Sequence, residues 1–412
     1  MSHRWRIAAA AVTTHLCLGS VYAWSIFVPA LQAQTGWSRP QLTWAFSLAI
    51  ACLGLTAALA APLVQRWGPR RTVTFSAVLF SAGLIIAGLA IHLGSRWLLY
   101  LGYGLVGGIG LGLGYVPPVT TLMRWFVDRK GFATGLAVGG FGLGALLASF
   151  LGEWLLRHSD CTRTFLLLGV GYGLVLLEAA RFLRLPDEPA APAPAKQGNP
   201  GLLVEPRFWL IWTIFFLNIA TGILLIALAR PMLEEAAVGL TQGAIPAVTA
   251  VAIMGLFNGL GRLGWSSLSD RLGRTSTWIG MFLVQTALFG LLWNTESPLV
   301  LAAGLWLIAS CYGGGFALCP ALVADTFGPA RAPQIYGLTL TAWSAAALLS
   351  PPLAAGMRES CGSYTVTLGF CAAVSLVGLI LVIALRRMPA RREEPVDPAA
   401  VSLAVGGFSA GN

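Results

Sequence analysis

The chain has 412 residues, of which 57% are hydrophobic and only 10% are charged. Water-soluble domains have about a quarter of their residues charged, so this composition excludes a soluble protein. The net charge of +10 does not indicate nucleic-acid binding, because the basic residues lie in short loops between apolar runs rather than on one exposed face.

Apolar segments long enough to cross a bilayer recur along the chain. The first follows the charged start His3–Arg6, is too long for the core of a signal peptide, and is predicted to be a retained helix. In round boundaries the twelve segments are residues 7–31, 40–64, 72–92, 98–123, 131–155, 164–184, 207–232, 243–268, 276–294, 298–323, 333–356 and 364–386. We therefore predict an all-α membrane protein with twelve transmembrane helices.

Positively charged residues indicate how these helices are oriented. They gather in the loops after the even-numbered segments, whereas the opposite loops are less basic and include Glu234, Glu235 and Glu296. The basic residues on the first side include Arg66, Arg70, Arg71, Arg124, Arg129, Lys130, Arg181, Arg184, Arg271, Arg274, Arg386 and Arg387. Because positively charged loops stay in the cytoplasm, we expect both termini to be cytoplasmic and the chain to span the inner (cytoplasmic) membrane.

One stretch breaks the apolar pattern. Residues 185–206 are rich in Pro and Ala, cannot form a core, and are predicted to be a cytoplasmic linker. The linker separates an N-terminal six-helix half, residues 1–184, from a C-terminal half, residues 207–388, and residues 389–412 are predicted to be a disordered cytoplasmic tail. Short matches between the halves recur at an offset of 202, which is typical of a duplicated transporter with two pseudo-symmetric halves.

A buried arginine marks the predicted binding site. Arg262 lies in the apolar run of the eighth segment, eight residues before Asp270 or about 12 Å along a helix. An arginine at the centre of a membrane helix costs roughly 2.5–3.5 kcal/mol on insertion scales, so such residues are rarely without function. We predict that Arg262, with Asn258 one turn earlier, binds the negative charge of a substrate.

The loop Asp270-Arg271-Leu272-Gly273-Arg274 resembles the loop signature of the major facilitator superfamily. The first half has a degenerate copy, in which Gln65 replaces the usual acid. Such a loop puts a carboxylate near the end of one helix and cations near the next, and this charge cluster can lock one conformation. Conformational gating is expected from Asp270, Arg271, Arg274, Arg66 and Arg70. The alternative is that the loops serve only as orientation signals.

A second resemblance is more specific. The run Gly19-Ser-Val-Tyr-Ala-Trp-Ser-Ile-Phe-Val-Pro-Ala-Leu31, together with Arg124-Trp125-Phe126 and Arg129-Lys130-Gly131, is similar to the oxalate–formate antiporter family and its bacterial monocarboxylate-transporter relatives. The resemblance extends to about residue 388. It implies the major facilitator fold and places Arg262 where these families have a substrate-binding arginine on helix eight.

Two departures from those families restrict the substrate. Oxalate-type carriers have a second cation on helix eleven, where this chain has Trp343, so a dicarboxylate would have one buried carboxylate without a partner. Animal monocarboxylate carriers have an aspartate four residues before the arginine and a lysine on helix one, whereas this chain has Asn258 and no such lysine. A single cation favours a single carboxylate.

Aromatic side chains in the middle of several segments are the predicted walls of the cavity. An apolar site with few polar groups suits a small organic acid. These candidates are Tyr22, Trp24, Tyr115, Tyr312, Phe316 and Trp343. For each one, ordinary packing between helices is the alternative.

His15 is the candidate for proton coupling. It precedes Tyr22 by seven residues, hence lies on the same helical face, and it is the titratable group in the first segment whose usual pKa is near neutrality. The alternative is a structural histidine that is hydrogen-bonded to a neighbouring helix.

The combined prediction is a secondary active transporter of a small monocarboxylate such as lactate, pyruvate or formate. Proton symport is favoured, because an anion moved alone would work against an inside-negative potential, and exchange of organic anions of the oxalate–formate type is the alternative. The chain contains no constellation typical of an enzyme, no ligand spacing typical of a metal site and no cofactor motif. We expect a monomer.

Overall fold

The computed structural model describes residues 3–186, 204–236, 247–295, 297–329 and 331–389. These residues form helices and short connections, and no strand occurs within these ranges, which confirms the predicted all-α class. Most of the predicted linker, residues 187–203, and nearly all of the predicted tail, residues 390–412, lie outside the described residues.

The helices follow the predicted segments closely. Their bounds are α1 His3–Gly19, η1 Ser20–Ala23, α2 Trp24–Thr35, α3 Arg39–His92, α4 Arg96–Leu99, η2 Tyr100–Gly107, α5 Gly108–Trp125, η3 Val127–Arg129, α6 Lys130–His158, α7 Cys161–Phe182, α8 Pro206–Ala236, α9 Ala247–Leu272, α10 Arg274–Leu292, α11 Pro298–Phe327, α12 Ala332–Thr339, α13 Thr341–Cys361 and α14 Thr365–Arg387. Two predicted segments, 40–64 and 72–92, both lie in α3, which bends at Gly68 (φ 75°).

Eleven stretches of the described residues are long and apolar enough to cross a membrane. The predicted segment 243–268 is not among them, and it corresponds to α9, whose helix is described from Ala247 onward. α9 is amply long for a span, at 26 residues, and it packs between α11 of its own half and α6 of the other.

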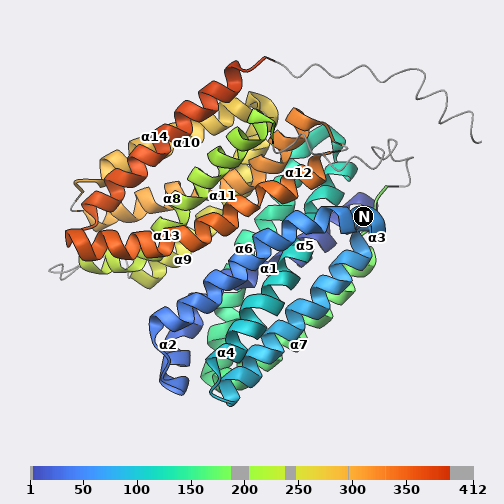
Figure 1. Ribbon diagram of the computed structural model, residues 1–412, viewed down its shortest axis with the longest axis vertical. Coiled ribbons are helices and arrows are strands. Elements are labelled where there is room, and N and C mark those ends of the chain that lie inside the picture. The colour runs from blue at the N-terminus through green and yellow to red at the C-terminus, as the bar shows by residue number, and fades with distance from the viewer. Residues whose placement is uncertain (1–2, 187–203, 237–246, 296, 330, 390–412) are drawn as a thin grey trace, which may run out of the picture.

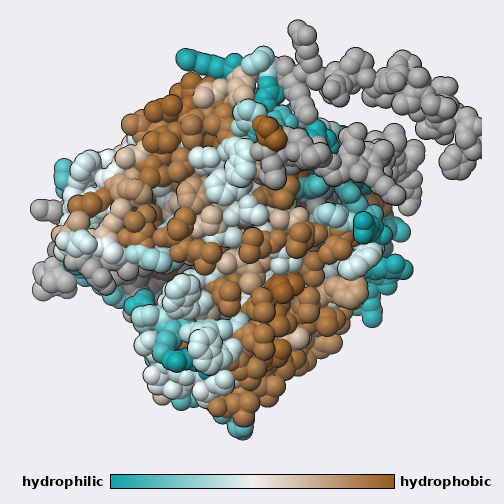
Figure 2. Space-filling view, viewed as in Figure 1, coloured by the Kyte–Doolittle hydropathy of each residue, from teal (hydrophilic) through white to brown (hydrophobic). Residues whose placement is uncertain are grey.

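The helices form two bundles that lie against each other. In Figure 1 the first bundle, α1 to α7, occupies the lower right, and the second, α8 to α14, occupies the upper left. The bundles meet chiefly where α6 packs against α9 and where α3 packs against α12 and α13. Large apolar side chains such as Trp44, Leu59 and Trp154 are exposed on the outside, and Figure 2 shows apolar surface along both bundles, as expected for helices that face lipid.

Glycines allow α6 to lie close to α1 of its own bundle and to α9 of the other bundle. A Cβ at Gly144 would lie 2.2 Å from the backbone oxygen of Leu16 on α1, and one at Gly142 would lie 2.9 Å from the Cα of Gly259 on α9. Distances this short leave no space for a side chain, so the glycine-rich run of α6 allows helix backbones to touch on two sides. α6 is thus the structural link between α1 and α9.

Two spans are interrupted close to predicted site residues. The first changes to a 3₁₀ turn at Ser20–Ala23 between α1 and α2, and the eleventh breaks at Leu340 between α12 and α13. Interruptions of this kind in membrane helices are common at binding sites, because they change the direction of nearby side chains. Tyr22 lies in the first interruption and Trp343 lies three residues after the second.

Candidate functional site

Arg262 is completely buried at the interface of the two bundles. Its Nε donates a hydrogen bond to Oδ1 of Asn258 (3.0 Å), and its Nη1 donates to the backbone oxygen of Val138 on α6 (3.2 Å). Its Nη2 has no hydrogen-bond partner, and no carboxylate of the described residues forms an ion pair with this guanidinium group. A buried cation without a counter-charge is expensive, so this arrangement is suited to binding an anion.

Small residues make room for this arginine. A Cβ at Gly313 of α11 would lie 3.1 Å from Cγ of Arg262, and a Cβ at Gly142 would lie 3.2 Å from its Nε. The guanidinium group also lies over two aromatic rings, with Cζ 4.9 Å from the ring centre of Phe316 and 5.6 Å from that of Phe141. These cation–π contacts hold the charge in an otherwise apolar environment.

Aromatic rings from both bundles surround this charge. Trp343 is at their centre, with ring centroids 4.7 Å from Phe316, 5.4 Å from Tyr115, 5.7 Å from Phe141 and 6.0 Å from Tyr22. The Tyr115 hydroxyl and Trp343 Nε1 are buried without hydrogen-bond partners. Together with Nη2 of Arg262, they are polar groups available to a small polar ligand.

A hydrogen bond between two tyrosines connects the bundles beside Arg262. The hydroxyl oxygens of Tyr22 on η1 and Tyr312 on α11 are 3.1 Å apart. Tyr312 also packs edge-on against Phe316, at a centroid distance of 5.3 Å. The structure thus brings seven of the eight predicted substrate-binding residues into one cluster: Arg262, Asn258, Tyr22, Tyr115, Tyr312, Phe316 and Trp343.

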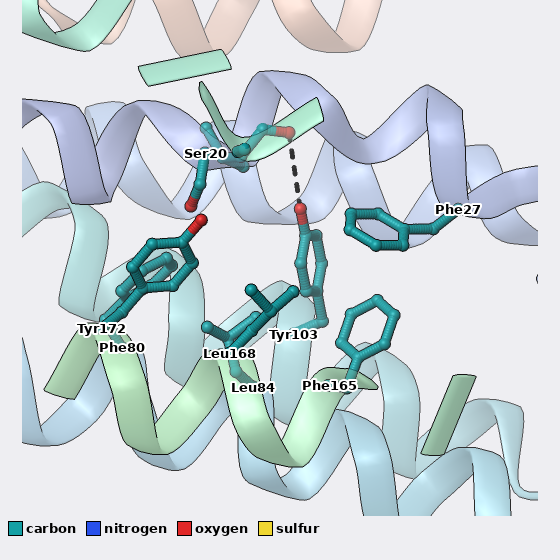
Figure 3. Close-up of a pocket in the computed structure, with 10 residues that line it drawn as sticks. Ser20, Phe27, Phe80, Leu84, Tyr103, Phe165, Leu168 and Tyr172 are labelled. Atoms are coloured by element: carbon teal, nitrogen blue, oxygen red, sulfur yellow. Dashed lines mark hydrogen bonds between the residues drawn. The ribbon is translucent and has the colours of Figure 1, made fainter. Parts of the chain in front are cut away.

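Trp24 is the eighth, and it does not belong to this cluster. It lies inside the first bundle, where its ring packs against that of Tyr103, with centroids 4.3 Å apart, and that of Phe165, with centroids 6.1 Å apart. Tyr22 lies in the 3₁₀ turn and Trp24 begins α2, and because residues two apart on a helix point to nearly opposite sides, the two side chains meet different neighbours. Figure 3 shows a small pocket beside it, lined by residues including Ser20, Tyr103, Phe165 and Tyr172, in which the Tyr103 hydroxyl donates to the oxygen of Val21.

His15 lies behind the aromatic cluster and is fully buried. Its Nδ1 is 2.6 Å from the backbone oxygen of Ala137 on α6, and its Nε2 is 3.0 Å from that of Tyr115 on α5. The imidazole is therefore hydrogen-bonded to neighbouring helices, and its ring centre lies 5.0 Å from that of Tyr115 and 6.1 Å from that of Phe141.

The loop after α9 connects the bundles through Asp270. Its carboxylate accepts hydrogen bonds from the backbone nitrogens of Gly131 (3.0 Å) and Phe132 (2.9 Å), at the start of α6. Arg274 pairs with Asp270 at 2.7 Å and with Asp325, at the end of α11, at 3.0 Å. Lys130 of the first bundle lies 3.5 Å from Asp325, which completes a charge network across the interface.

The other predicted gating residues are not in this network. Arg271, Arg66 and Arg70 are exposed, and their side chains form no hydrogen bond or ion pair with any described residue. The difference between the two loops has a simple cause, because the first-half loop lacks an acid at Gln65 and so cannot cap the start of another helix as Asp270 does.

Sequence reasoning did not select Phe141, Asp325 or Lys130 for these roles. Phe141 stands alone among glycines in the run Gly139-Gly140-Phe141-Gly142, and a single large ring in such a run is the signal that could have found it. Asp325 is the only acid in α11, near its end, which could have indicated a partner for the loop cations. In the described residues, no group of three or more His, Cys, Asp or Glu side chains could hold a metal ion.

Comparisons with known proteins agree with this architecture. The profile of the Major Facilitator Superfamily matches residues 10–293 and 241–408. The chain belongs to the Major Facilitator Superfamily. It is therefore a multi-pass membrane transporter and not an enzyme.

Individual relatives in the superfamily include carriers of organic anions. The chain is 28% identical to the oxalate:formate antiporter of Oxalobacter formigenes, over 88% of this chain and 87% of that protein. It is 30% identical to monocarboxylate transporter 11 of Mus musculus, over 93% and 87% of the two chains. Among solved structures, the proton:xylose symporter XylE has the same fold, with a TM-score of 0.74 at 15% identity over 93% of this chain and 96% of XylE.

Proposed function

We propose that the chain transports a small monocarboxylate, whose carboxylate binds Arg262 between the two bundles. The observation that carries this proposal is the buried guanidinium group, whose Nη2 has no partner and which no described carboxylate neutralises. A carboxylate there would gain a charge-assisted hydrogen bond in an apolar setting, where such bonds are strongest.

The surrounding rings limit the size of the substrate. The ring centres of Tyr115, Phe141 and Phe316 each lie within 6 Å of that of Trp343, so the body of the acid must be small and partly apolar. Lactate, pyruvate and formate fit this description. The relatives support the same class, since their names include monocarboxylate transport and oxalate:formate exchange.

The transport cycle that we propose is alternating access around this site. The Asp270, Arg274, Asp325 and Lys130 network would hold the bundles together at one end and would break when that end opens. We propose that this end is cytoplasmic, because its loops are positively charged. In this proposal the unit is a monomer in the inner membrane with both termini cytoplasmic. Proton symport is the favoured mode, and exchange of organic anions is the alternative.

A ligand-binding experiment tests the proposal. Formate, lactate, pyruvate and oxalate are each added to the purified protein and the shift in melting temperature is measured. We expect a monocarboxylate to stabilise the wild type and to have no effect on Arg262→Gln, which keeps a polar side chain but not the charge. Arg271→Gln, which removes an exposed arginine of the same helix, serves as the control and should respond like the wild type. Equal stabilisation of the Arg262→Gln protein would refute the proposal.

Proton symport and anion exchange are separated by transport in liposomes. For symport, uptake of pyruvate requires a pH gradient and no internal anion. For exchange, uptake requires an internal anion and is insensitive to the gradient.

A further inference from the structure

His15 has an unusual pair of hydrogen-bond partners. Both ring nitrogens face backbone carbonyl oxygens, at 2.6 Å and 3.0 Å, and a carbonyl oxygen can only accept. A neutral imidazole has one N–H group and one lone pair, so it can donate to only one of the two. The protonated imidazolium has two N–H groups and satisfies both. The geometry of this buried site is therefore complementary to the charged form.

The groups that face His15 leave this charge without a compensating anion from the protein. α5 contributes Tyr115, α6 contributes Phe141, and α9 contributes the charge of Arg262. Tyr172 of α7 points toward Ser20 instead (Figure 3). No carboxylate of the described residues faces the imidazole. A second positive charge beside Arg262 is unfavourable unless an anion binds near both.

α6 connects this histidine directly to the anion site. His15 contacts the carbonyl of Ala137 from α1, and Arg262 donates to the carbonyl of the next residue, Val138, from α9. The two side chains come from different bundles and meet consecutive peptide groups of one helix. A change at either side chain thus acts on the same short segment of α6.

From this arrangement we infer that His15 carries the proton that moves with the substrate anion. The inference rests on the proposed function and assigns the proton to one residue. The lone pair of the neutral imidazole takes a proton from water on one side of the membrane, which forms an N–H bond, and releases it to water on the other side. With the proton and the carboxylate both bound, the site has the same net charge as when it is empty.

Linkage makes this coupling measurable. If anion binding favours protonation of His15, then protonation tightens anion binding by the same factor. The complex then holds more protons than the free protein, so the affinity for the anion rises as the pH falls. For one coupled proton the change reaches tenfold per pH unit at most.

The first experiment observes His15 without changing it. The variant His3→Gln/His92→Gln/His158→Gln removes the three exposed histidines and leaves His15 as the only imidazole. With ¹⁵N-labelled histidine, the nitrogen chemical shifts distinguish neutral from protonated imidazole. We expect saturating pyruvate, lactate or formate to convert His15 to the protonated form at a pH at which His15 is neutral in the ligand-free protein. A bound monocarboxylate that leaves His15 neutral down to pH 5 would overturn the inference.

The second experiment measures affinity against pH. We expect the dissociation constant of the bound monocarboxylate to decrease as the pH is lowered, both in the wild type and in His158→Gln. In His15→Gln it should be independent of pH. A pH dependence that persists in His15→Gln, with binding still abolished by Arg262→Gln, rejects the role of His15 and leaves the proposed function standing. Failure of every monocarboxylate to bind the wild type rejects the proposed function itself.

Discussion

At the scale of single residues, the substrate class depends on what surrounds Arg262. The guanidinium group uses two of its nitrogens on Asn258 and Val138 and keeps Nη2 free of protein partners. Trp343, whose position in related oxalate carriers is expected to hold a second cation, instead packs against Phe316 at 4.7 Å. One cation and one ring favour a ligand with one charged end and one apolar end.

Replacing this ring with a cation should change the substrate class. We expect Trp343→Lys to bind oxalate and to lose affinity for pyruvate. The added lysine pairs with the second carboxylate of oxalate, whereas with pyruvate bound its charge has no partner and is repelled by Arg262. Trp343→Phe, which removes the indole without adding charge, should keep the monocarboxylate preference. The measurement is the shift in melting temperature with each acid. Unchanged selectivity in Trp343→Lys would show that the side chain at this position does not contact a second carboxylate of the ligand.

At the scale of secondary structure elements, α6 determines how closely the bundles meet. Gly142 contacts the backbone of Gly259 on α9, whereas a Cβ at Gly139, one turn away, would have no neighbouring atom nearer than 3.8 Å. The sequence showed that the segment is rich in glycine and predicted close contacts. It did not show which glycines touch which helix, because that depends on the rotation of α6 about its axis.

This difference provides a matched pair of alanine variants. We expect Gly142→Ala to slow pyruvate uptake into liposomes strongly, since its Cβ overlaps the α9 backbone and overpacking of this kind costs about 1–3 kcal/mol in the conformation with the bundles in contact. Gly139→Ala should transport at close to the wild-type rate, because its Cβ has space. If both variants transport equally well, the close contact of α6 and α9 is not needed for the cycle.

At the scale of the whole molecule, the proposed orientation in the membrane rests on the positive loops. The charge network of Asp270, Arg274, Asp325 and Lys130 lies at the same end as those loops, and α13 ends at Cys361 on the opposite side. Of the seven cysteines, all without disulfides, Cys361 is exposed, Cys52 is partly buried and the others are buried. The native chain therefore has a natural reporter of topology.

A labelling experiment uses this cysteine. We expect a membrane-impermeant maleimide added to intact cells to label the protein at Cys361, because the loop after the eleventh span faces outward when both termini are cytoplasmic. The Cys361→Ser variant should lose the label. Labelling of Cys361 only after the cells are opened would reverse the proposed orientation.

Much of this protein could be read from the sequence, because the bilayer leaves few alternatives. Long apolar segments in a bilayer form helices, their number and the positive loops predict the topology, and an arginine inside one of them indicates a functional site. Arg262 is predicted on this basis, and Tyr22 and Trp343 are predicted as aromatic residues in the middle of their segments; the structure places the three together. Only the tertiary structure could show that Phe141 joins them and that Trp24 packs against Tyr103 and Phe165 instead, since the packing of the helices decides which neighbours each side of a span meets. The two carbonyl partners of His15 belong to α5 and α6, about a hundred residues away or more, and contacts over such separations depend on how the helices pack and not on any local pattern.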